Sequence, residues 1–334
     1  MREWTAYARD DLMHLISQWP LRCLIRARPV VALTVGFSVA GCGADLSEVH
    51  GPDDSSQPPS LSNGPPPLVA GVTTGVYFAC AVKTAGPLAC WGDDFGGQTL
   101  PPRGQFTQVA SGYFHSCAIR TDGTVACWGF GESGETTPPP GTFTRVSAGS
   151  GFSCGIRSDA TIACWGYEAD GRTSPPEGSF VDLSLFSAHG CAIRIDGTLA
   201  CWGLNDHGEA SPPEGTFTRV STGEVHSCAI STDGSMQCWG YNEDGRINTA
   251  EGTYTEVGAG MYHTCAIRSQ GKLACWGPDG SGAEVQPPTG TFTRVSSQQG
   301  YSCGLRGDGF VECWGSDSHG QASPPGSVRP PGGP

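Results

Sequence analysis

Residues 106–129, FTQVASGYFHSCAIRTDGTVACWG, contain the pattern that decides the fold. Two stretches with the alternation of β-strands, 106–112 and 116–120, precede a third at 124–129. Thr121-Asp122-Gly123 separates the last two stretches, and it fits a three-residue hairpin loop with glycine in the left-handed region. This segment therefore predicts a small antiparallel sheet of three strands.

The register of the hairpin follows from its loop. If Arg120 and Thr124 close the loop, Cys117 lies opposite Cys127 at a non-hydrogen-bonded position. Cα atoms at such positions are about 4.5 Å apart, which is compatible with a cross-strand disulfide. Each such bond closes a short loop and contributes about 2–3 kcal/mol in the chain-entropy model.

The same unit occurs seven times. Cys-Trp-Gly recurs with a spacing of 37 residues, lengthened once to 38, and each of its cysteines follows another by ten residues. Glycine occupies the third loop position in six units, and Ala160 replaces it in the other. A fixed period of this length indicates a repeat architecture. We predict one disulfide in each unit: Cys80–Cys90, Cys117–Cys127, Cys154–Cys164, Cys191–Cys201, Cys228–Cys238, Cys265–Cys275 and Cys303–Cys313.

Both faces of each predicted sheet are apolar or small. One face of the second unit carries cysteine and Ile119, and the other carries Ala118, Ala126 and Trp128. Such sheets need cover on both sides, which identical neighbours provide in a propeller. We predict an all-β, seven-bladed β-propeller over residues 67–327, with three to four antiparallel strands per blade. We expect the tryptophan of one blade to pack against the small alanine or glycine face of the next.

Composition narrows the class of protein. The chain has 16 Cys, 15% charged residues and a net charge of −13. The negative charge argues against binding nucleic acid through its phosphates. So many cysteines favour an oxidising compartment. The chain lacks the richness in Ala, Glu, Lys and Leu that coiled coils and long helical bundles have, which excludes both classes.

The N-terminal segment has the features of an export signal. Basic residues precede the apolar run PVVALTVGFSVAG at 29–41, and Val39-Ala40-Gly41-Cys42 resembles a bacterial lipobox. We therefore expect a signal peptide at 1–41, lipidation of Cys42, and an outer-membrane or cell-surface lipoprotein, with a periplasmic or secreted protein as the alternative. Translation from Met1 or from Met13 stays open. Residues 42–66 are acidic and rich in Ser, Pro and Gly, which predicts a disordered tether, and 328–334 form a Pro/Gly tail.

The variable loops suggest where a partner binds. The loop between the first two strands and the loop after Trp-Gly are expected on one face, because the strands alternate in direction. Exposed aromatic residues rimmed by acidic residues are typical of a protein-binding surface. We predict partner-binding residues at Val76, Tyr77, Phe95, Tyr113, Phe114, Tyr167, Glu224, Val225, Tyr241, Met261 and Tyr262. The alternative is that these aromatic residues only close the propeller channel.

The sequence supports a metal site or an enzyme active site less well than a binding surface. His115, His189, His226 and His263 occupy one position of the unit, but Phe or Tyr replaces histidine in the other units, so we expect packing and no metal or cofactor. The acidic loops suggest calcium, yet no EF-hand pattern is present. No hydrolase, zinc-protease or phosphate-loop motif occurs, and we predict no catalytic residue. A propeller lyase or hydrolase that uses channel residues remains the alternative function.

The unit, VxxGxxHSCAIxxDGTxxCWGxxxxxGQxxxP with variations, resembles the regulator-of-chromosome-condensation repeat family. Its short period and Gly97-Gln98-Thr99 with Pro101 are closer to the bacterial propeller-type β-lactamase-inhibitory proteins. The resemblance covers residues 67–327 and implies a seven-bladed propeller that acts by protein contact. We expect a monomer that binds an envelope or extracellular protein or glycan. Nucleotide exchange, the activity of a eukaryotic member, is a third possibility that would require a cytosolic protein.

Overall fold

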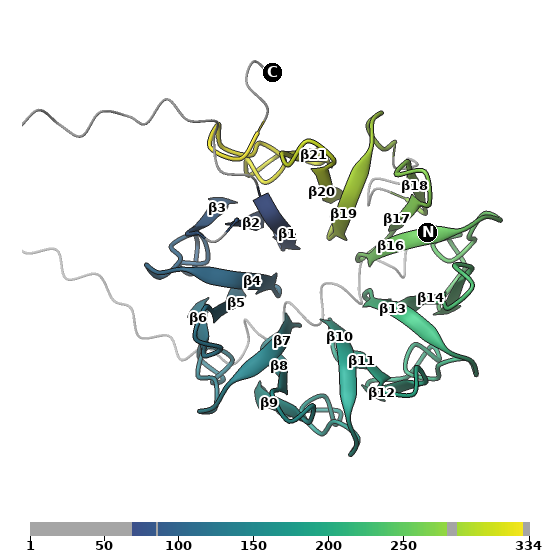
Figure 1. Cartoon of the computed structure of the whole chain (residues 1–334), viewed down its shortest axis with the longest axis horizontal. Helices are drawn as coiled ribbons and strands as arrows, with labels where there is room; N and C mark the ends of the chain where they lie inside the picture. Colours follow the sequence, from purple (N-terminus) through teal and green to yellow (C-terminus); the bar gives the residue numbers. More distant parts are fainter. Residues whose placement is uncertain (1–68, 85, 279–285, 330–334) are drawn as a thin grey trace, which may run out of the picture. The chain divides into compact units, whose positions relative to one another are not determined.

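A computed structural model describes residues 69–84, 86–278 and 286–329, and every regular element in these ranges is a β-strand. The strands form seven antiparallel sheets of three strands each, arranged as a ring in sequence order (Figure 1). This architecture confirms the predicted seven-bladed propeller, with three strands in each blade. The predicted signal peptide, lipobox and tether, and residues 330–334 of the tail, lie outside the described residues.

Each blade uses its three strands in the same way. The first strands surround the central channel (Figure 1): β1 (Val69–Gly75), β4 (Phe106–Ser111), β7 (Phe143–Ala148), β10 (Phe180–Phe186), β13 (Phe217–Thr222), β16 (Tyr254–Ala259) and β19 (Phe292–Ser297). The second strands lie in the middle of the sheets: β2 (Phe78–Lys83), β5 (His115–Arg120), β8 (Phe152–Arg157), β11 (His189–Arg194), β14 (His226–Ser231), β17 (Thr264–Arg268) and β20 (Tyr301–Arg306). The third strands are outermost: β3 (Leu88–Gly92), β6 (Val125–Gly129), β9 (Ile162–Gly166), β12 (Leu199–Gly203), β15 (Met236–Gly240), β18 (Leu273–Trp276) and β21 (Val311–Gly315).

The predicted hairpin register is confirmed. Arg120 and Thr124 close the second blade's loop through a 2.8 Å hydrogen bond from N–H to carbonyl, and Cys117 pairs with Cys127. All seven predicted disulfides are formed, with Cα atoms 4.0–4.1 Å apart. The third loop residue has a positive φ, 85° at Gly123 and 69° at Ala160. Ala160 therefore keeps a left-handed conformation that is unfavourable for a residue with a Cβ.

The core lies between blades, and its packing corrects one expectation. Trp128 does not pack on the small face of the next blade. It packs, with Phe106 and Ala118 of its own blade, against the face of the preceding blade that carries Phe78 and Cys80. Trp202, Trp165 and Trp314 likewise pack against the cysteine-bearing face of the preceding blade. The reason is the symmetry of the ring. Blades related by rotation always bring unlike faces together. Tryptophan lies on the same face as alanine, so it cannot meet the alanine face of a neighbouring blade.

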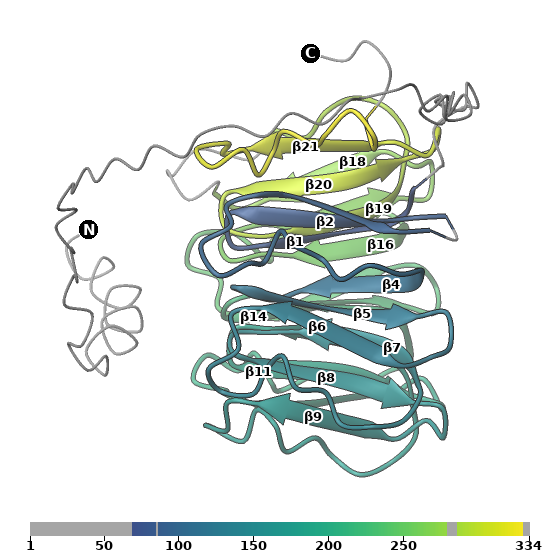
Figure 2. The same cartoon turned by 90° about the vertical axis from the view of Figure 1, so that its left-hand side faces the viewer.

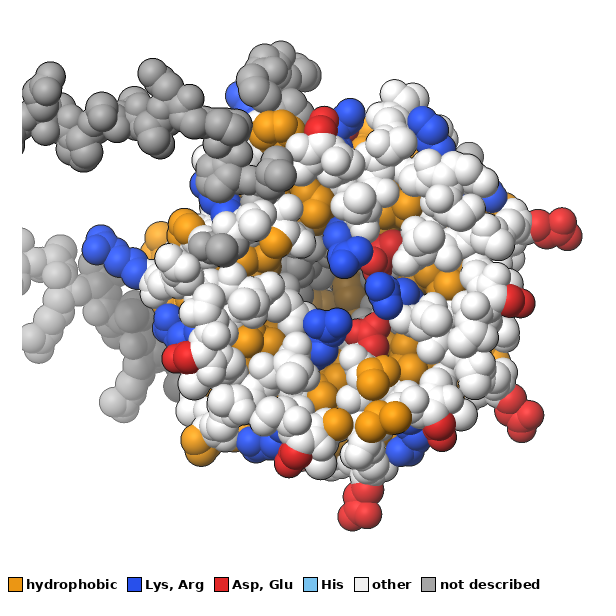
Figure 3. All heavy atoms as spheres, viewed as in Figure 1, with side chains coloured by type: hydrophobic (Ala, Val, Ile, Leu, Met, Phe, Trp, Pro, Cys, Tyr) orange, Lys and Arg blue, Asp and Glu red, His pale blue; other side chains and the backbone are white. Residues whose placement is uncertain are grey.

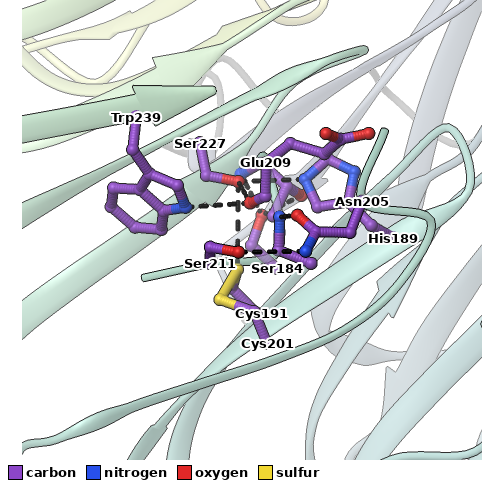
Figure 4. The surroundings of a disulfide bond; sticks show 11 residues. Ser184, His189, Cys191, Cys201, Asn205, Glu209, Ser211, Ser227 and Trp239 are labelled. Carbon is purple, nitrogen blue, oxygen red and sulfur yellow. Dashed lines mark hydrogen bonds between the residues drawn. A yellow bond between two sulfur atoms is a disulfide. The ribbon is translucent and has the colours of Figure 1, made fainter. Parts of the chain in front are cut away.

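In five blades the indole N–H donates to a carbonyl of the preceding blade, whereas the buried Trp314 Nε1 has no hydrogen-bond partner among the described residues. Trp128 Nε1 donates to the carbonyl of Gln98 at 2.8 Å, and Trp239 Nε1 donates to that of Glu209 at 2.8 Å (Figure 4). The same contact closes the ring, since Trp91 Nε1 donates to the carbonyl of Gln321 at 2.9 Å. The last blade thus lies beside the first in both views (Figures 1 and 2). Val328 completes the closure by packing in the cluster that contains Val69.

Candidate functional site

The two sets of variable loops meet on one face of the propeller. We call the loops between first and second strands the inner loops, and residues 93–98, 130–135, 167–172, 204–209, 241–246 and 316–321 the outer loops. In six blades an outer-loop N–H donates to an inner-loop carbonyl, for example Phe130 to Phe114 at 2.9 Å. We call this surface the loop face. The opposite surface, which carries the turns between second and third strands, is the hairpin face.

The loop face is acidic. Its outer loops carry two arginines against eleven carboxylates: Asp93, Asp94, Glu132, Glu135, Glu168, Asp170, Asp206, Glu209, Glu243, Asp244 and Asp317. Nine of these carboxylates reach the surface, because Glu135 and Glu209 are buried. Both arginines form ion pairs within their loops, Arg172 with Asp170 at 2.8 Å and Arg246 with Asp244. Charge on the hairpin face is more balanced, because aspartates of the turns lie close to arginines that end the second strands, as Asp308 does to Arg306 at 3.3 Å.

Three of the predicted aromatic residues lie on the outer loops. Phe95 is 77% exposed and Tyr167 is 50% exposed, whereas Tyr241 is half-buried. The Tyr241 hydroxyl donates to Glu243 at 2.9 Å. Desolvation and this carboxylate raise the pKa of Tyr241 to about 12. Arginines support two of the rings, since the guanidinium carbons of Arg172 and Arg246 lie 5.2 and 5.0 Å from the ring centres of Tyr167 and Tyr241.

The predicted inner-loop residues lie deeper. Tyr113 donates its hydroxyl to Glu224, which also accepts from the Ser187 hydroxyl at 3.1 Å. Burial and the Glu224 charge raise the pKa of Tyr113 well above its usual value. The Tyr113 ring meets Phe186 edge-on at 5.7 Å. These contacts join three blades across the end of the channel.

The remaining inner-loop predictions fall around this cluster. Val76 is only 4% exposed, and Tyr77 stacks on His319 of the last blade with ring centres 4.3 Å apart. The others are half-buried: Phe114, Val225, Met261 and Tyr262. The predicted residues therefore form two groups, an exposed one on the outer loops and a packed one that closes the channel.

The channel is lined in three layers by alternate residues of the first strands. The layer nearest the loop face is glycine in five blades, with Phe186 and the buried Gln298 in the other two. A Cβ at Gly112 would lie 2.3 Å from the carbonyl oxygen of Gly149, so this layer requires glycine where the inner loops touch. The middle layer consists of Thr73, Ala110, Ser147, Ser184, Ser221, Gly258 and Ser296, which line a cavity of about 130 Å³.

The third layer forms a ring of charges at the hairpin-face mouth of the channel. Its members are Gly71, Gln108, Arg145, Asp182, Arg219, Glu256 and Arg294. Ion pairs connect them, Arg145 to Asp182 at 3.9 Å and Glu256 to both Arg219 and Arg294 at 3.8 and 3.2 Å. Charged side chains gather round the central hollow in Figure 3. The ring was not predicted from the sequence. Its signal is the alternating charge at one position of the unit, two residues after the first residue of each first strand.

The recurring histidines are buried between blades. His115, His189, His226 and His263 each hydrogen-bond through Nε2 to a hydroxyl of the following blade, at 2.7–2.9 Å (Figure 4 shows His189 with Ser227). Burial lowers the pKa of His115 to about 4 and that of His189 to about 3. The described residues contain no group of three histidine, cysteine or acidic side chains placed to hold a metal. Histidine, phenylalanine and tyrosine thus serve here as interblade packing residues.

Comparison with known proteins supports an RCC1-like repeat. The model of the regulator of chromosome condensation (RCC1) repeat matches residues 106–135, 217–246 and 254–282. A search of curated proteins finds no match. The described residues contain no helix long and apolar enough to span a bilayer.

Three solved propellers illustrate the structural similarity. The CRINKLY ectodomain of the Arabidopsis thaliana receptor kinase ACR4 is 22% identical, with a TM-score of 0.64, and the match covers 78% of this chain and 99% of that one. The ectodomain of the Physcomitrella patens receptor kinase CR4 is 22% identical, with a TM-score of 0.63, and the match covers 73% of this chain and 72% of that one. Prp20p of Saccharomyces cerevisiae, described with its binding to Gsp1p and histones, is 14% identical, with a TM-score of 0.60, and the match covers 75% of this chain and 83% of that one. At these identities the similarity concerns the fold alone.

Proposed function

The chain is an RCC1-like repeat propeller, and from this premise we propose that it is an exported binding module that holds a protein partner on its loop face. The single observation that carries the proposal is the composition of that face. Exposed Phe95 and Tyr167 stand among nine outer-loop carboxylates that are not buried and two internally paired arginines. Aromatic anchors supply most of the binding energy of a typical interface, while charges around them select the partner.

The charge of the loop face defines the partner's chemistry. A surface with this excess of carboxylates attracts a basic protein surface and repels acidic ones. Since Arg172 and Arg246 already pair within their own loops, they neutralise little of the remaining charge. We therefore favour a basic envelope or extracellular protein as the partner, and a neutral or anionic glycan fits this face less well.

The rigid part of the face lies at its centre. Tyr113, Glu224 and Ser187 link the second, fourth and fifth blades. Their substitution would disturb loop positions as well as any contact with a partner. Phe95 and Tyr167 are the sharper probes, because their side chains are largely solvent-exposed.

The two kinds of structural neighbour are consistent with a role in binding. Two are receptor ectodomains, and Prp20p is described with its binding to Gsp1p and histones. We extend only the general property, protein contact through propeller loops, to this chain. Seven disulfides favour an oxidising compartment, which agrees with export. Lipidation of Cys42 and attachment to the outer membrane or cell surface belong to the same proposal.

The test compares two faces of one molecule. The triple variant F95A/Y167A/Y241A removes the outer-loop aromatics, and V181A/I195A removes two apolar side chains that are 52% and 65% exposed on the hairpin face. Partners are captured from the envelope fraction by the full chain, identified by mass spectrometry, and titrated as purified proteins. We expect the triple variant to weaken binding at least about tenfold, V181A/I195A to bind like the wild type, and binding to weaken with added salt. Equal loss in both variants, or capture of a glycan in place of a protein, would refute the proposal.

Export and anchoring have their own measurement. The intact mass of the natively expressed protein, alkylated without reductant, should correspond to a chain that starts at Cys42 with acyl groups and no alkylated thiols. A full-length chain with all sixteen thiols alkylated would show a cytosolic protein. It would refute export and reopen nucleotide exchange as a function.

A further inference from the structure

The channel is a blind hole that differs from both faces. At the loop face it is closed by Phe186, which is 7% exposed, and by Tyr113 in contact with it. At the hairpin face its mouth carries the ring of Arg145, Asp182, Arg219, Glu256 and Arg294, with the hollow visible in Figure 3. Between these ends lies the hydroxyl-lined cavity of about 130 Å³. Apart from Tyr113, which belongs to the centre of the loop face, none of these channel residues contributes to the loop-face site proposed above.

The middle layer presents hydrogen-bond donors to the cavity. The hydroxyl oxygens of Thr73, Ser147 and Ser221 each accept a backbone N–H of the following blade, at 2.9–3.0 Å. An accepting hydroxyl keeps its own proton for donation. The other two serines of the layer differ, because Ser184 and Ser296 also share a hydrogen bond with the hydroxyls of Thr222 and Thr74. The wall can therefore donate at several points around the cavity.

The mouth presents positive charge outward. The side chains of Arg145 and Arg294 are both 53% exposed and that of Arg219 is 43% exposed, whereas Asp182 and Glu256 are 24% and 14% exposed. An ion that approaches the mouth thus meets guanidinium groups before it meets carboxylates. Three arginines against two carboxylates also leave one positive charge in excess at this ring, in a protein whose net charge is −13.

From these two layers we propose that the channel binds a small oxyanion, a carboxylate or phosphate group, which enters through the arginine ring and is held by the serine and threonine hydroxyls. Guanidinium groups match the geometry of both oxyanions. A volume of about 130 Å³ accommodates a few water molecules, at about 30 Å³ each, or one such group. A free ion and the terminal group of a larger molecule share this chemistry.

The test titrates the full-length oxidised protein with inorganic phosphate at low ionic strength by calorimetry. We expect R219Q to weaken binding about tenfold, because it removes one of the three positive charges at the mouth. E256Q should instead tighten binding about threefold, because it removes a repelling charge beside the site. R157Q is the matched control, since Arg157 packs over Phe143 outside the ring, and it should bind like the wild type. Melting temperatures establish that each variant is folded.

Two kinds of result would overturn the proposal. Absence of binding at about 10 mM phosphate would do so, because even weak specific sites are occupied at that concentration. So would binding that R219Q and E256Q leave unchanged, which would place the ion elsewhere. Acetate and glycerol phosphate serve as further probes. Binding of glycerol phosphate as tight as that of phosphate would support the terminal group of a larger molecule, and binding of inorganic phosphate alone would support a free ion.

Discussion

Acid should destabilise this propeller through its buried histidines, and His115 shows how. Its imidazole is 1% exposed and hydrogen-bonds to the Ser153 hydroxyl of the next blade at 2.7 Å. Burial lowers its pKa from 6.5 to about 4 in the folded state. In the unfolded chain the imidazole is in water and binds its proton near pH 6.5. Protons therefore favour the unfolded chain, and the stability present above pH 6.5 is lost as the pH falls.

The magnitude follows from the linkage relation. One extra proton on the unfolded chain costs about 1.4 kcal/mol per pH unit, so between pH 6.5 and about 4 the loss from His115 reaches about 3 kcal/mol. His189, whose pKa is lowered to about 3, loses about 5 kcal/mol over its wider window. Burial also lowers the pKa of His226 well below 6.5, so three blades contribute with the same sign. Together these losses are comparable with the 5–15 kcal/mol typical of a folded domain.

The assay is guanidinium unfolding of the oxidised protein at pH 7.0, 6.0, 5.0 and 4.5, followed by tryptophan fluorescence. The variant His115→Phe uses the residue that occupies the same position in the first and third blades, Phe78 and Phe152. We expect it to reduce the dependence of unfolding free energy on pH by about 1.4 kcal/mol per unit between pH 6 and 4.5. His207→Gln, at an exposed histidine, is the matched control and should keep the wild-type slope. An unchanged slope in His115→Phe, or an NMR titration of His115 above pH 5.5, would refute the reasoning.

Three further predictions concern the scaffold. Ala160→Gly removes the Cβ from a left-handed residue and should stabilise the fold by about 1 kcal/mol, measured in thermal melts. Gly123→Ala should destabilise the fold, because the alanine would have a positive φ and its Cβ would lie 3.2 Å from Thr142. A stabilised Gly123→Ala variant would contradict the backbone argument. Replacing Cys191 and Cys201 together by serine should lower the free energy of unfolding by about 3 kcal/mol, because the disulfide closes a loop with a sequence separation of 10 residues. Chemical unfolding measures this change. An unchanged midpoint would show that the unfolded chain gains no conformational freedom when the disulfide is lost. Ending the chain after residue 315 removes the carbonyl that accepts from Trp91 and the packing of Val328. We therefore expect a lower melting temperature and faster proteolysis of the first blade. Unchanged resistance of the first blade to protease would mean that the ring closes without this segment.

The sequence predicted what is local and repeated. The hairpin register depends on one three-residue loop, so Arg120 and Thr124 were enough to place Cys117 opposite Cys127. Seven copies of that unit, each apolar on both faces, then required a closed ring. The side on which the tryptophan packs was predicted wrongly, because the alternation within one sheet does not say which neighbour covers which face. Rotational symmetry requires unlike faces to meet, so the face with Trp128 and Ala118 packs on the face with Phe78 and Cys80.

The candidate sites were harder to predict for a different reason. Partner-binding residues were chosen by loop position and residue type, and loop position alone does not separate Phe95, which is exposed, from Tyr113, which is held by Glu224 of another blade. The partner of Tyr113 lies 111 residues away, so no local pattern could indicate it. The charged ring was missed because each of its members looks like an ordinary polar residue within its own strand. Only the ring brings Arg219 and Arg294 to the same carboxylate of Glu256.

The repeat explains why the two candidate sites lie where they do. Positions that pack between blades are nearly invariant from unit to unit, as the cysteines, the tryptophans and the buried Val or Leu of the first strands show. A substitution there affects two blades at once, because every interface uses one face of each. Channel positions and outer-loop positions contact water or the opposite side of the ring, and these are the positions at which Gly71, Gln108, Arg145 and Asp182 differ although they are equivalent. The channel axis and the loop face are thus two places where equivalent residues of the blades differ in charge and size, and we expect a ligand of the molecule to bind at one of these two surfaces.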